Sequence, residues 1–193
     1  MEYLPAPSRP PSPAAEVHVW RIAGDLESDR ALRLVLARYL GEAPEAIALA
    51  RGERGKPRLA KAPERLAFNL SHSGELTLVA VTRGREVGVD VEREEPERDL
   101  VALAERALAP EDAAAVQAAA EGERTSVFYA LWTRHEARLK CLGVGFGKAV
   151  WPSPPLAVQA IPADPGYAAA VAVTGDPVPA RFWTLDPPRP NDG

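Results

Sequence analysis

The sequence has a single cysteine among its 193 residues, Cys141, and it lacks any long apolar run. One cysteine excludes an internal disulfide and is typical of a reducing compartment. No run approaches the ~20 apolar residues that a membrane-spanning helix needs. An excess of basic residues is also absent, because the net charge is −4 and the pI is about 5.5, which argues against a general nucleic-acid binder. We therefore expect a cytoplasmic enzyme or binding protein that contacts neither membranes nor nucleic acid.

Proline, in contrast, is abundant and is concentrated at the two ends of the chain. Five prolines lie within residues 1–15 and three within residues 187–193. Because proline offers no amide donor to a helix or a sheet, we predict a disordered tail over residues 1–15 and a flexible tail over residues 187–193. The stretch between these tails is long enough to bury a core.

Periodicity predicts both strands and helices between the tails. Strands are predicted at Val17–Ile22, Ala46–Ala50, Leu66–Leu70, Leu76–Thr82, Val87–Glu92, Val158–Ile161, Ala168–Val173 and Phe182–Leu185. Helices are predicted at Asp29–Leu40, Leu100–Ala107, Pro110–Ala120 and Thr125–Leu142. We expect the fourth and fifth strands to form a hairpin and the last three to form a meander. The order of these elements predicts an α+β fold.

Carboxylates on one strand and one helix suggest a metal site. In the strand Val87–Glu92, the valines share one face, whereas Asp90 and Glu92 lie on the other. On the last predicted helix, Glu136 and Lys140 are four residues apart and share a face. Three carboxylates form an oxygen-rich site that suits a hard cation such as Mg²⁺, which keeps positions open for water and phosphates.

Each of these signals also has an ordinary interpretation. The two strand carboxylates fit a charged sheet edge, and Glu136 with Lys140 fits a surface ion pair. Cys141 fits helix packing. The basic stretch of residues 51–65 fits a solvated surface. However, the carboxylates occur together with two further motifs, Gly55-Lys56-Pro57 and Asn69-Leu70-Ser71-His72-Ser73.

In this order and spacing, the motifs resemble the phosphopantetheinyl transferases of the larger, two-lobed type first known from surfactin synthesis. The matching segments are Gly55–Pro57, Asn69–Ser73, Gly88–Glu92 and Trp132–Lys140. The second half alone also resembles the smaller holo-carrier-protein synthases. The resemblance implies two pseudo-duplicated α+β lobes, with a shortened first lobe over residues 16–88, a second over residues 89–186, and an active site in the cleft between them.

The resemblance also implies a reaction and its partners. The phosphopantetheine arm of coenzyme A would pass to a serine of an acyl or peptidyl carrier protein, releasing adenosine 3′,5′-bisphosphate. It assigns Asp90, Glu92 and Glu136 to a magnesium ion and Lys140 to the pyrophosphate. The resemblance also assigns four residues to coenzyme A, because they match family positions that touch its nucleotide end: Lys56, Pro57, Ser71 and His72. We expect a monomer.

The resemblance does not decide which residue is the catalytic base, and the sequence differs from the family pattern at two places. Either Glu136 or Glu111 would accept the serine proton. His135 stands where the family has lysine, and histidine titrates near neutrality. The segment of residues 25–29 is short and acidic, whereas the family has at this place a basic helix that binds the coenzyme's 3′-phosphate. A degenerate member that binds coenzyme A or a carrier protein without catalysis is therefore the alternative.

Overall fold

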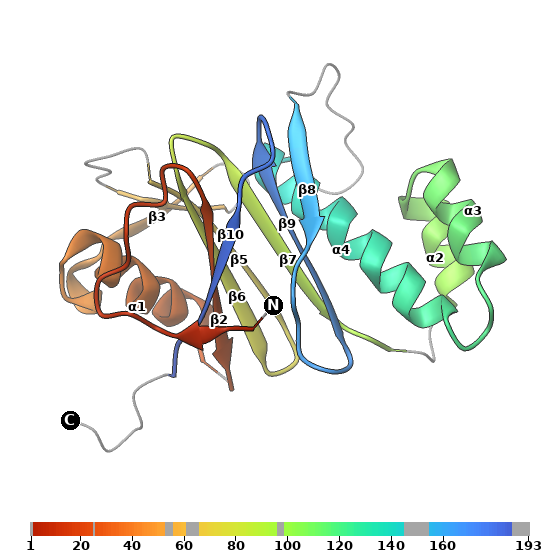
Figure 1. Cartoon of the computed structure of the whole chain (residues 1–193), viewed down its shortest axis with the longest axis horizontal. Coiled ribbons are helices and arrows are strands. Elements are labelled where there is room, and N and C mark those ends of the chain that lie inside the picture. The colour runs from red at the N-terminus through yellow and green to blue at the C-terminus, as the bar shows by residue number, and fades with distance from the viewer. Residues whose placement is uncertain are drawn as a thin grey trace.

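The computed structural model describes residues 2–24, 26–52, 56–60, 66–95, 99–144 and 155–186 (Figure 1). Its strands are β1 (Leu4–Pro5), β2 (Val17–Ala23), β3 (Leu49–Arg51), β4 (Pro57–Leu59), β5 (Leu66–Ser73), β6 (Leu76–Arg83), β7 (Val87–Arg93), β8 (Leu156–Ala160), β9 (Tyr167–Thr174) and β10 (Ala180–Thr184). Its helices are α1 (Ser28–Leu40), α2 (Leu100–Ala107), α3 (Pro110–Ala118) and α4 (Arg124–Leu142), with a short 3₁₀ turn η1 (Pro44–Ala46). These elements confirm the predicted α+β class. None of the described helices is long and apolar enough to cross a membrane.

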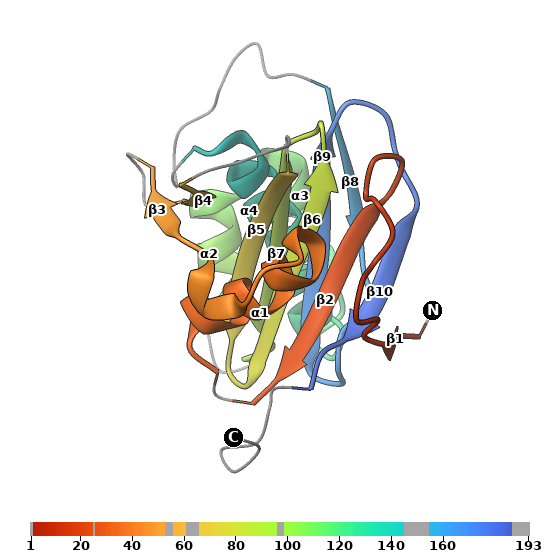
Figure 2. The ribbon, with the colours of Figure 1, turned by 90° about the vertical axis from the view of Figure 1, so that its left-hand side faces the viewer.

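The strands form two larger sheets and a small ribbon. The first sheet has the order β1-β10-β2-β6-β5, the second has the order β7-β9-β8, and β3 pairs with β4. Figures 1 and 2 show α1 against the first sheet and α4 against the second, with the two sheets between the helices. The edge strands β5 and β7 lie side by side where the sheets meet.

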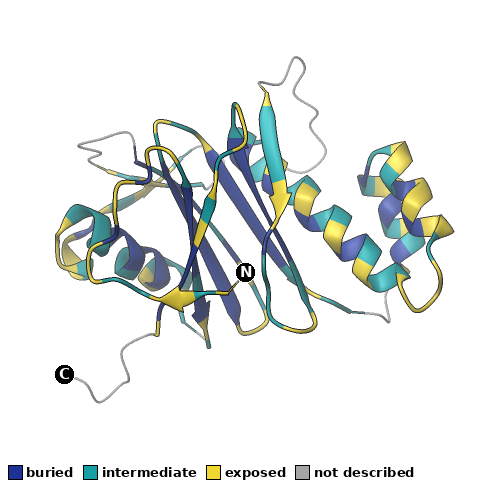
Figure 3. Ribbon diagram, in the orientation of Figure 1, coloured by how far each residue is buried: buried dark blue, intermediate teal, exposed yellow. Residues whose placement is uncertain are grey.

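Alternation along the strands explains this layering. In β9, Val171 and Val173 face the core between the two sheets, whereas Ala170 and Ala172 face Ala137 of α4. The other face of the first sheet packs against α1. Figure 3 shows the result, with buried strands at the centre and exposed residues along the outer sides of the helices. Every large element therefore covers an apolar face of its neighbour.

Two of the helices end at a glycine. Gly41 follows α1 with φ 70°, and Gly143 follows α4 with φ 65°. Residues with a Cβ rarely adopt this left-handed conformation, so glycine is favoured at both positions. The amide of Gly143 donates to the carbonyl of Lys140. This hydrogen bond caps the end of α4 at Lys140, a candidate site residue.

The predicted hairpin between Leu76–Thr82 and Val87–Glu92 is wrong. β6 pairs with β5 on one edge and β2 on the other, and β7 pairs with β9. Gly84, with φ 77°, lies in the turn that carries the chain from the first sheet to the second. Because both edges of β6 are occupied within the first sheet, β7 is left to begin another.

The predicted C-terminal meander is wrong at its last strand. β8 and β9 pair as expected, but β10 pairs in parallel with β2 and β1 in the first sheet. The C-terminal part of the expected second lobe therefore completes the sheet of the first. This crossing places Phe182 in the core shared by both sheets.

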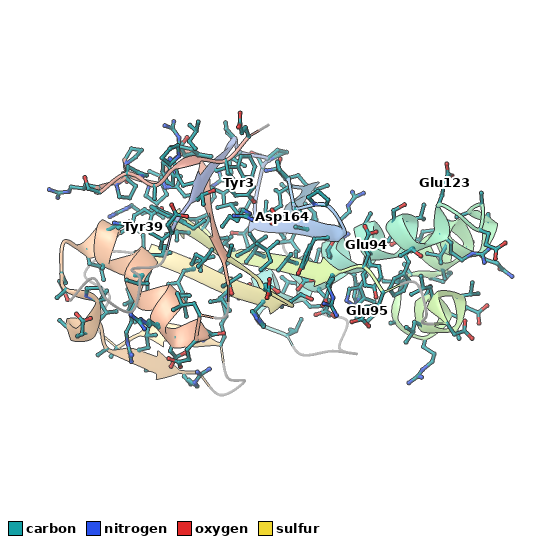
Figure 4. All side chains as sticks on the ribbon, turned by 90° about the horizontal axis from the view of Figure 1, so that it is seen from below. Tyr3, Tyr39, Glu94, Glu95, Glu123 and Asp164 are labelled. Atoms are coloured by element: carbon teal, nitrogen blue, oxygen red, sulfur yellow. The ribbon has the colours of Figure 1, made fainter. Side chains whose placement is uncertain are left out.

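The prediction of a disordered tail is wrong for residues 2–15. β1 pairs with β10, and the Tyr3 hydroxyl donates a 2.9 Å hydrogen bond to the carbonyl of Pro162. The Pro13 carbonyl accepts from the amide of Arg83. Figure 4 labels Tyr3 and Asp164 at this junction. Proline cannot donate, but its extended backbone and carbonyl suit a sheet edge. The other predicted tail, residues 187–193, lies outside the described residues.

His18 is fully buried in β2 and has a polar partner at each ring nitrogen. Its Nε2 lies 2.8 Å from Glu16 Oε1, and its Nδ1 lies 2.8 Å from the Tyr39 hydroxyl. Tyr39 also accepts a hydrogen bond from Trp20 Nε1, so its single proton is free to be donated to Nδ1. The imidazole proton then lies on Nε2 and is donated to Glu16, which also pairs with Arg181.

We expect acid to destabilise the protein through His18. Burial lowers the pKa of His18, against the opposing influence of Glu16. The unfolded chain, in which histidine has a pKa of about 6.5, therefore takes up this proton first. The contribution of His18 to stability is constant above about pH 6.5 and is lost as the pH falls below it.

Thermal melting between about pH 7.5 and about pH 5.5 checks this prediction. The matched variant is His18→Gln, whose amide retains a donor for Glu16 and an acceptor for Tyr39 but does not titrate. The wild-type melting temperature should fall further than that of the variant. Equal losses in the two proteins would contradict the prediction.

Candidate functional site

The candidate site lies where β7 passes unusually close to α4. Gly88 on β7 faces the helix, and a Cβ at this position would meet the carbonyl of Ala137 and the backbone of Cys141, with Cys141 Cα only 2.9 Å away. Only glycine allows strand and helix to approach this closely. The approach brings Asp90, two residues further along the strand, to the helix face that carries Glu136 and Lys140.

Asp90 is the centre of the site and is only 1% exposed. Its Oδ1 accepts a 2.6 Å hydrogen bond from Lys140 Nζ and a 2.9 Å hydrogen bond from the Ser71 hydroxyl. Lys140 Nζ also donates to Ser71 Oγ over 2.9 Å. Three predicted site residues, from β5, β7 and α4, are thus joined in one hydrogen-bonded cluster.

The carboxylates around Lys140 disfavour one another's charge. Burial raises the pKa of Asp90, against the opposing effect of the Lys140 ammonium. Burial also raises the pKa of Glu136, and the charge of Asp90 raises it further, with a smaller contribution from Glu92. The Lys140 ammonium pairs with Asp90 and lowers the pKa of Glu136, but three carboxylates influence one another here, so additional positive charge would stabilise the group.

Two oxygens of this cluster fit a cation. Among the described residues, Asp90 Oδ2 and Glu136 Oε1 are buried and have no hydrogen-bond partner. Leaving a buried carboxylate oxygen unsatisfied is costly, and such oxygens are the donors that magnesium prefers. The donor chemistry therefore fits the expected metal.

The three predicted ligands are nevertheless not assembled into a closed site. Within the described ranges, no group of three His, Cys, Asp or Glu side chains could hold a metal ion. The Lys140 ammonium lies against Asp90, and Glu92 Oε2 accepts a 3.0 Å hydrogen bond from Ser73. The magnesium site stays a prediction.

Lys56 and Pro57 lie beside a cavity rather than within the carboxylate cluster. Lys56 Nζ donates to the carbonyl of Lys140 over 3.2 Å and to that of Val87 over 3.3 Å, so it joins β7 to the end of α4. The cavity, of about 520 Å³, is lined by Lys56, Pro57, Arg58, Leu59, Leu66, Ala67, Phe68, Gly84, Arg85, Glu86 and Thr174. Gly55 and part of the basic stretch of residues 51–65 lie outside the described residues.

Other predicted residues do not join the cluster. His72 is exposed, and strand alternation places it on the opposite face of β5 from Ser71. Glu111 is exposed in the first turn of α3. His135 is half-buried on α4, where burial and Arg138 lower its pKa while Asp112 raises it. The roles expected for His72 and Glu111 therefore stay predictions.

Sequence reasoning assigned no role to Asn69 or Ser73, although both belong to a quoted motif. Both bond to β7, as Ser71 does. The signal was present in the sequence, because residues 69, 71 and 73 are polar at every second position of a strand. Cys141 is buried and burial raises its thiol pKa to about 11, which agrees with the packing role expected for it.

Comparison with known proteins gives one consistent result. The family described as the 4'-phosphopantetheinyl transferase superfamily matches residues 86–186. The 4'-phosphopantetheinyl transferase HetI of a Nostoc species is 32% identical over 230 residues, covering 94% of this chain and 97% of that protein. AcpT of Escherichia coli is 37% identical over 112 residues, covering 58% of this chain and 55% of that protein. The 4'-phosphopantetheinyl transferase gsp of Aneurinibacillus migulanus is 32% identical over 114 residues, covering 59% and 46%.

Proposed function

Since the chain belongs to the 4'-phosphopantetheinyl transferase superfamily, we propose that it transfers the 4'-phosphopantetheine arm of coenzyme A to a serine of an acyl or peptidyl carrier protein. Adenosine 3',5'-bisphosphate is the leaving group. The two larger sheets and the similarity to HetI over almost the whole chain support the two-lobed type of enzyme. The single observation that carries the proposal is the Asp90–Lys140–Ser71 cluster beside a carboxylate oxygen of Glu136 that has no hydrogen-bond partner among the described residues.

The chemistry requires positive charge at the pyrophosphate. As the bond to the leaving phosphate breaks, negative charge builds on that phosphate and must be neutralised. A magnesium ion, held by Asp90, Glu92 and Glu136, would supply most of that charge when bound. The Lys140 ammonium, which is bonded to Asp90, adds a positive point charge beside these carboxylates. Glu136 or Glu111 accepts the proton of the carrier serine.

The cavity beside Lys56 suits the nucleotide end of coenzyme A. Its volume of about 520 Å³ is within the range of ordinary ligand pockets. The lining offers apolar surface for a nucleobase at Pro57, Leu59 and Phe68. It also offers positive charge for phosphates at Arg58 and Arg85. Lys56 links this cavity to α4 through the carbonyl of Lys140, so nucleotide and pyrophosphate would be held by connected residues.

The decisive experiment is a mass measurement on a purified apo carrier protein. Incubation with this chain, coenzyme A and magnesium should increase the carrier mass by one phosphopantetheine. Carrier proteins of fatty-acid, polyketide and peptide synthesis should be tried in parallel. Binding of coenzyme A without any mass increase on these carriers would favour the degenerate, non-catalytic alternative.

We expect Lys140→Ala to lower turnover by about a hundredfold, the scale of losing one stabilising donor at a developing charge. The variant should also unfold more easily, because buried Asp90 loses the ammonium that compensates its charge. Transfer rates and thermal melting measure the two effects. Lys140→Gln is the matched control, since it restores a hydrogen-bond donor without charge and should recover stability more than rate. An unchanged rate and melting temperature in Lys140→Ala would make Lys140 an ordinary surface residue.

A further inference from the structure

The two larger sheets meet at β5 and β7 without sharing a backbone ladder. β5 is the last strand of the first sheet and β7 is the first strand of the second. The strands lie side by side (Figure 1), and the edge of β7 that faces β5 presents a row of backbone amides. Because an edge amide without an acceptor is costly when buried, these amides need partners from elsewhere.

Side chains of β5 supply those partners in a regular series. Asn69 Oδ1 accepts from the amide of Val89 over 2.9 Å. Ser71 Oγ accepts from the amide of Val91 over 3.3 Å, and Ser73 Oγ accepts from that of Arg93 over 3.0 Å. Each acceptor is 20 residues before its donor. The offset is constant because side chains on one face of β5 and amides on one edge of β7 both recur every two residues. We call Asn69, Ser71 and Ser73 the polar ladder.

The two serines of the polar ladder also hold the candidate metal ligands. The Ser71 hydroxyl donates to Asp90 Oδ1 over 2.9 Å, and the Ser73 hydroxyl donates to Glu92 Oε2 over 3.0 Å. Ser71 additionally accepts from Lys140 Nζ. One donated and two accepted hydrogen bonds use the full capacity of a hydroxyl, and Ser71 is only 5% exposed. Its hydroxyl is therefore committed to the protein rather than to a coenzyme.

We propose that Asn69, Ser71 and Ser73 are positioning residues, which fix β7 against β5 and thereby orient Asp90, Glu92 and Lys140 for phosphopantetheine transfer. The inference rests on the proposed function for its catalytic part and differs from the coenzyme contact expected of Ser71. A coenzyme contact and a positioning residue change different kinetic constants. Loss of a group that orients a ligand costs about ten- to a hundredfold in activity.

The experiment compares Ser71→Ala, Ser73→Ala and Ser73→Thr, with Ser126→Ala as the matched control. Ser126 is on α4, and within the described part of the chain its hydroxyl bonds locally, to the carbonyl of Glu123. Amide hydrogen exchange is followed by NMR at Val91 and Arg93, with Val89 as internal reference. Turnover and the Michaelis constant for coenzyme A are measured on the same samples, and thermal melting shows that each variant is folded.

In Ser73→Ala, the Arg93 amide should exchange several-fold faster while Val89 is unchanged, and turnover should fall by about ten- to a hundredfold. Ser73→Thr retains the hydroxyl and should restore both values. Ser71→Ala should lower turnover while the Michaelis constant for coenzyme A changes little. Ser126→Ala should match the wild type.

Two results would overturn the proposal. A raised Michaelis constant with unchanged turnover in Ser71→Ala would make Ser71 a coenzyme contact. Unchanged exchange at Val91 and Arg93 in the alanine variants would show that the polar ladder does not hold β7. If the wild-type chain transfers no phosphopantetheine, the proposed function fails, and the exchange rates still decide whether the ladder exists.

Discussion

Replacing Asp90 with Asn or Glu136 with Gln should lower transfer to a carrier protein by more than about a hundredfold. Changes to residues that merely support a metal ligand typically cost about ten- to a hundredfold, and both carboxylates are expected to bind the ion directly. Each carries a buried oxygen without a partner among the described residues. An amide of the same size removes the charge that holds both the ion and Lys140.

The two variants should agree in activity but differ in stability. Asp90→Asn removes a carboxylate whose pKa is raised by burial, which by itself would favour folding at neutral pH. It leaves the Lys140 ammonium without its 2.6 Å partner, however, and because removing one partner of a buried ion pair is strongly destabilising, this second effect should dominate and the protein should unfold more easily. Glu136→Gln removes a carboxylate whose pKa is raised by burial and by the charge of Asp90. Because a raised carboxylate pKa disfavours the folded state at neutral pH, this variant should be at least as stable as the wild type. Such a gain in stability with a loss of activity is common at functional sites.

Turnover at ordinary magnesium, Mn²⁺ binding by the isolated protein and thermal melting separate these effects. Glu105→Gln is the matched control, since Glu105 is exposed on α2 and should leave all three measurements unchanged. Near-normal turnover in either Asp90→Asn or Glu136→Gln would show that these carboxylates are not metal ligands. Loss of activity together with unchanged Mn²⁺ binding would instead assign them another catalytic role.

Gly88→Ala should destabilise the fold strongly and abolish most of the activity. The added Cβ would overlap the Ala137 carbonyl and the Cys141 backbone, and helix backbone atoms cannot rotate away as a side chain can. Overpacking a core typically costs 1–3 kcal/mol and sometimes more (about 2 kcal/mol as a central value). Relief requires β7 and α4 to separate, which moves Asp90 away from Lys140. Activity should therefore fall even at temperatures where the variant remains folded.

The control for this prediction is Gly122→Ala. Apart from its chain neighbours, no atom of the described residues lies within 4 Å of a Cβ added at Gly122, and its φ is not in the left-handed region. Chemical denaturation and turnover should match the wild type, because alanine meets neither a clash nor backbone strain there. If Gly88→Ala also keeps its free energy of unfolding and its rate, the close packing of β7 on α4 is not what positions the site.

Much of the local structure could be predicted from the sequence. The helix predicted at Leu100–Ala107 has the same bounds in the structure, and the helix predicted at Thr125–Leu142 begins one residue earlier. Apolar residues repeat with the period of the element they occupy, and glycine is favoured after helix ends. Both rules depend only on neighbours along the chain, so they do not require knowledge of the fold.

Strand partners could not be predicted in the same way. Leu76–Thr82 was expected to pair with Val87–Glu92 but pairs with β2 and β5, and Phe182–Leu185 was expected beside β9 but pairs with β2. Backbone hydrogen bonds are the same for any sequence, so they do not select a partner. The choice depends on which arrangement buries the most apolar surface from distant segments.

The sequence by itself determined which side chains share a face. A period of two placed Asp90 with Glu92, and a period of 3.6 placed Glu136 with Lys140, whatever the tertiary fold. Only the tertiary structure decided that these two faces meet, because the contact depends on the missing side chain of Gly88 against the backbone of α4. It also decided that Ser71 and Ser73 bond to the carboxylates while His72 does not, since that depends on which face of β5 is turned toward β7.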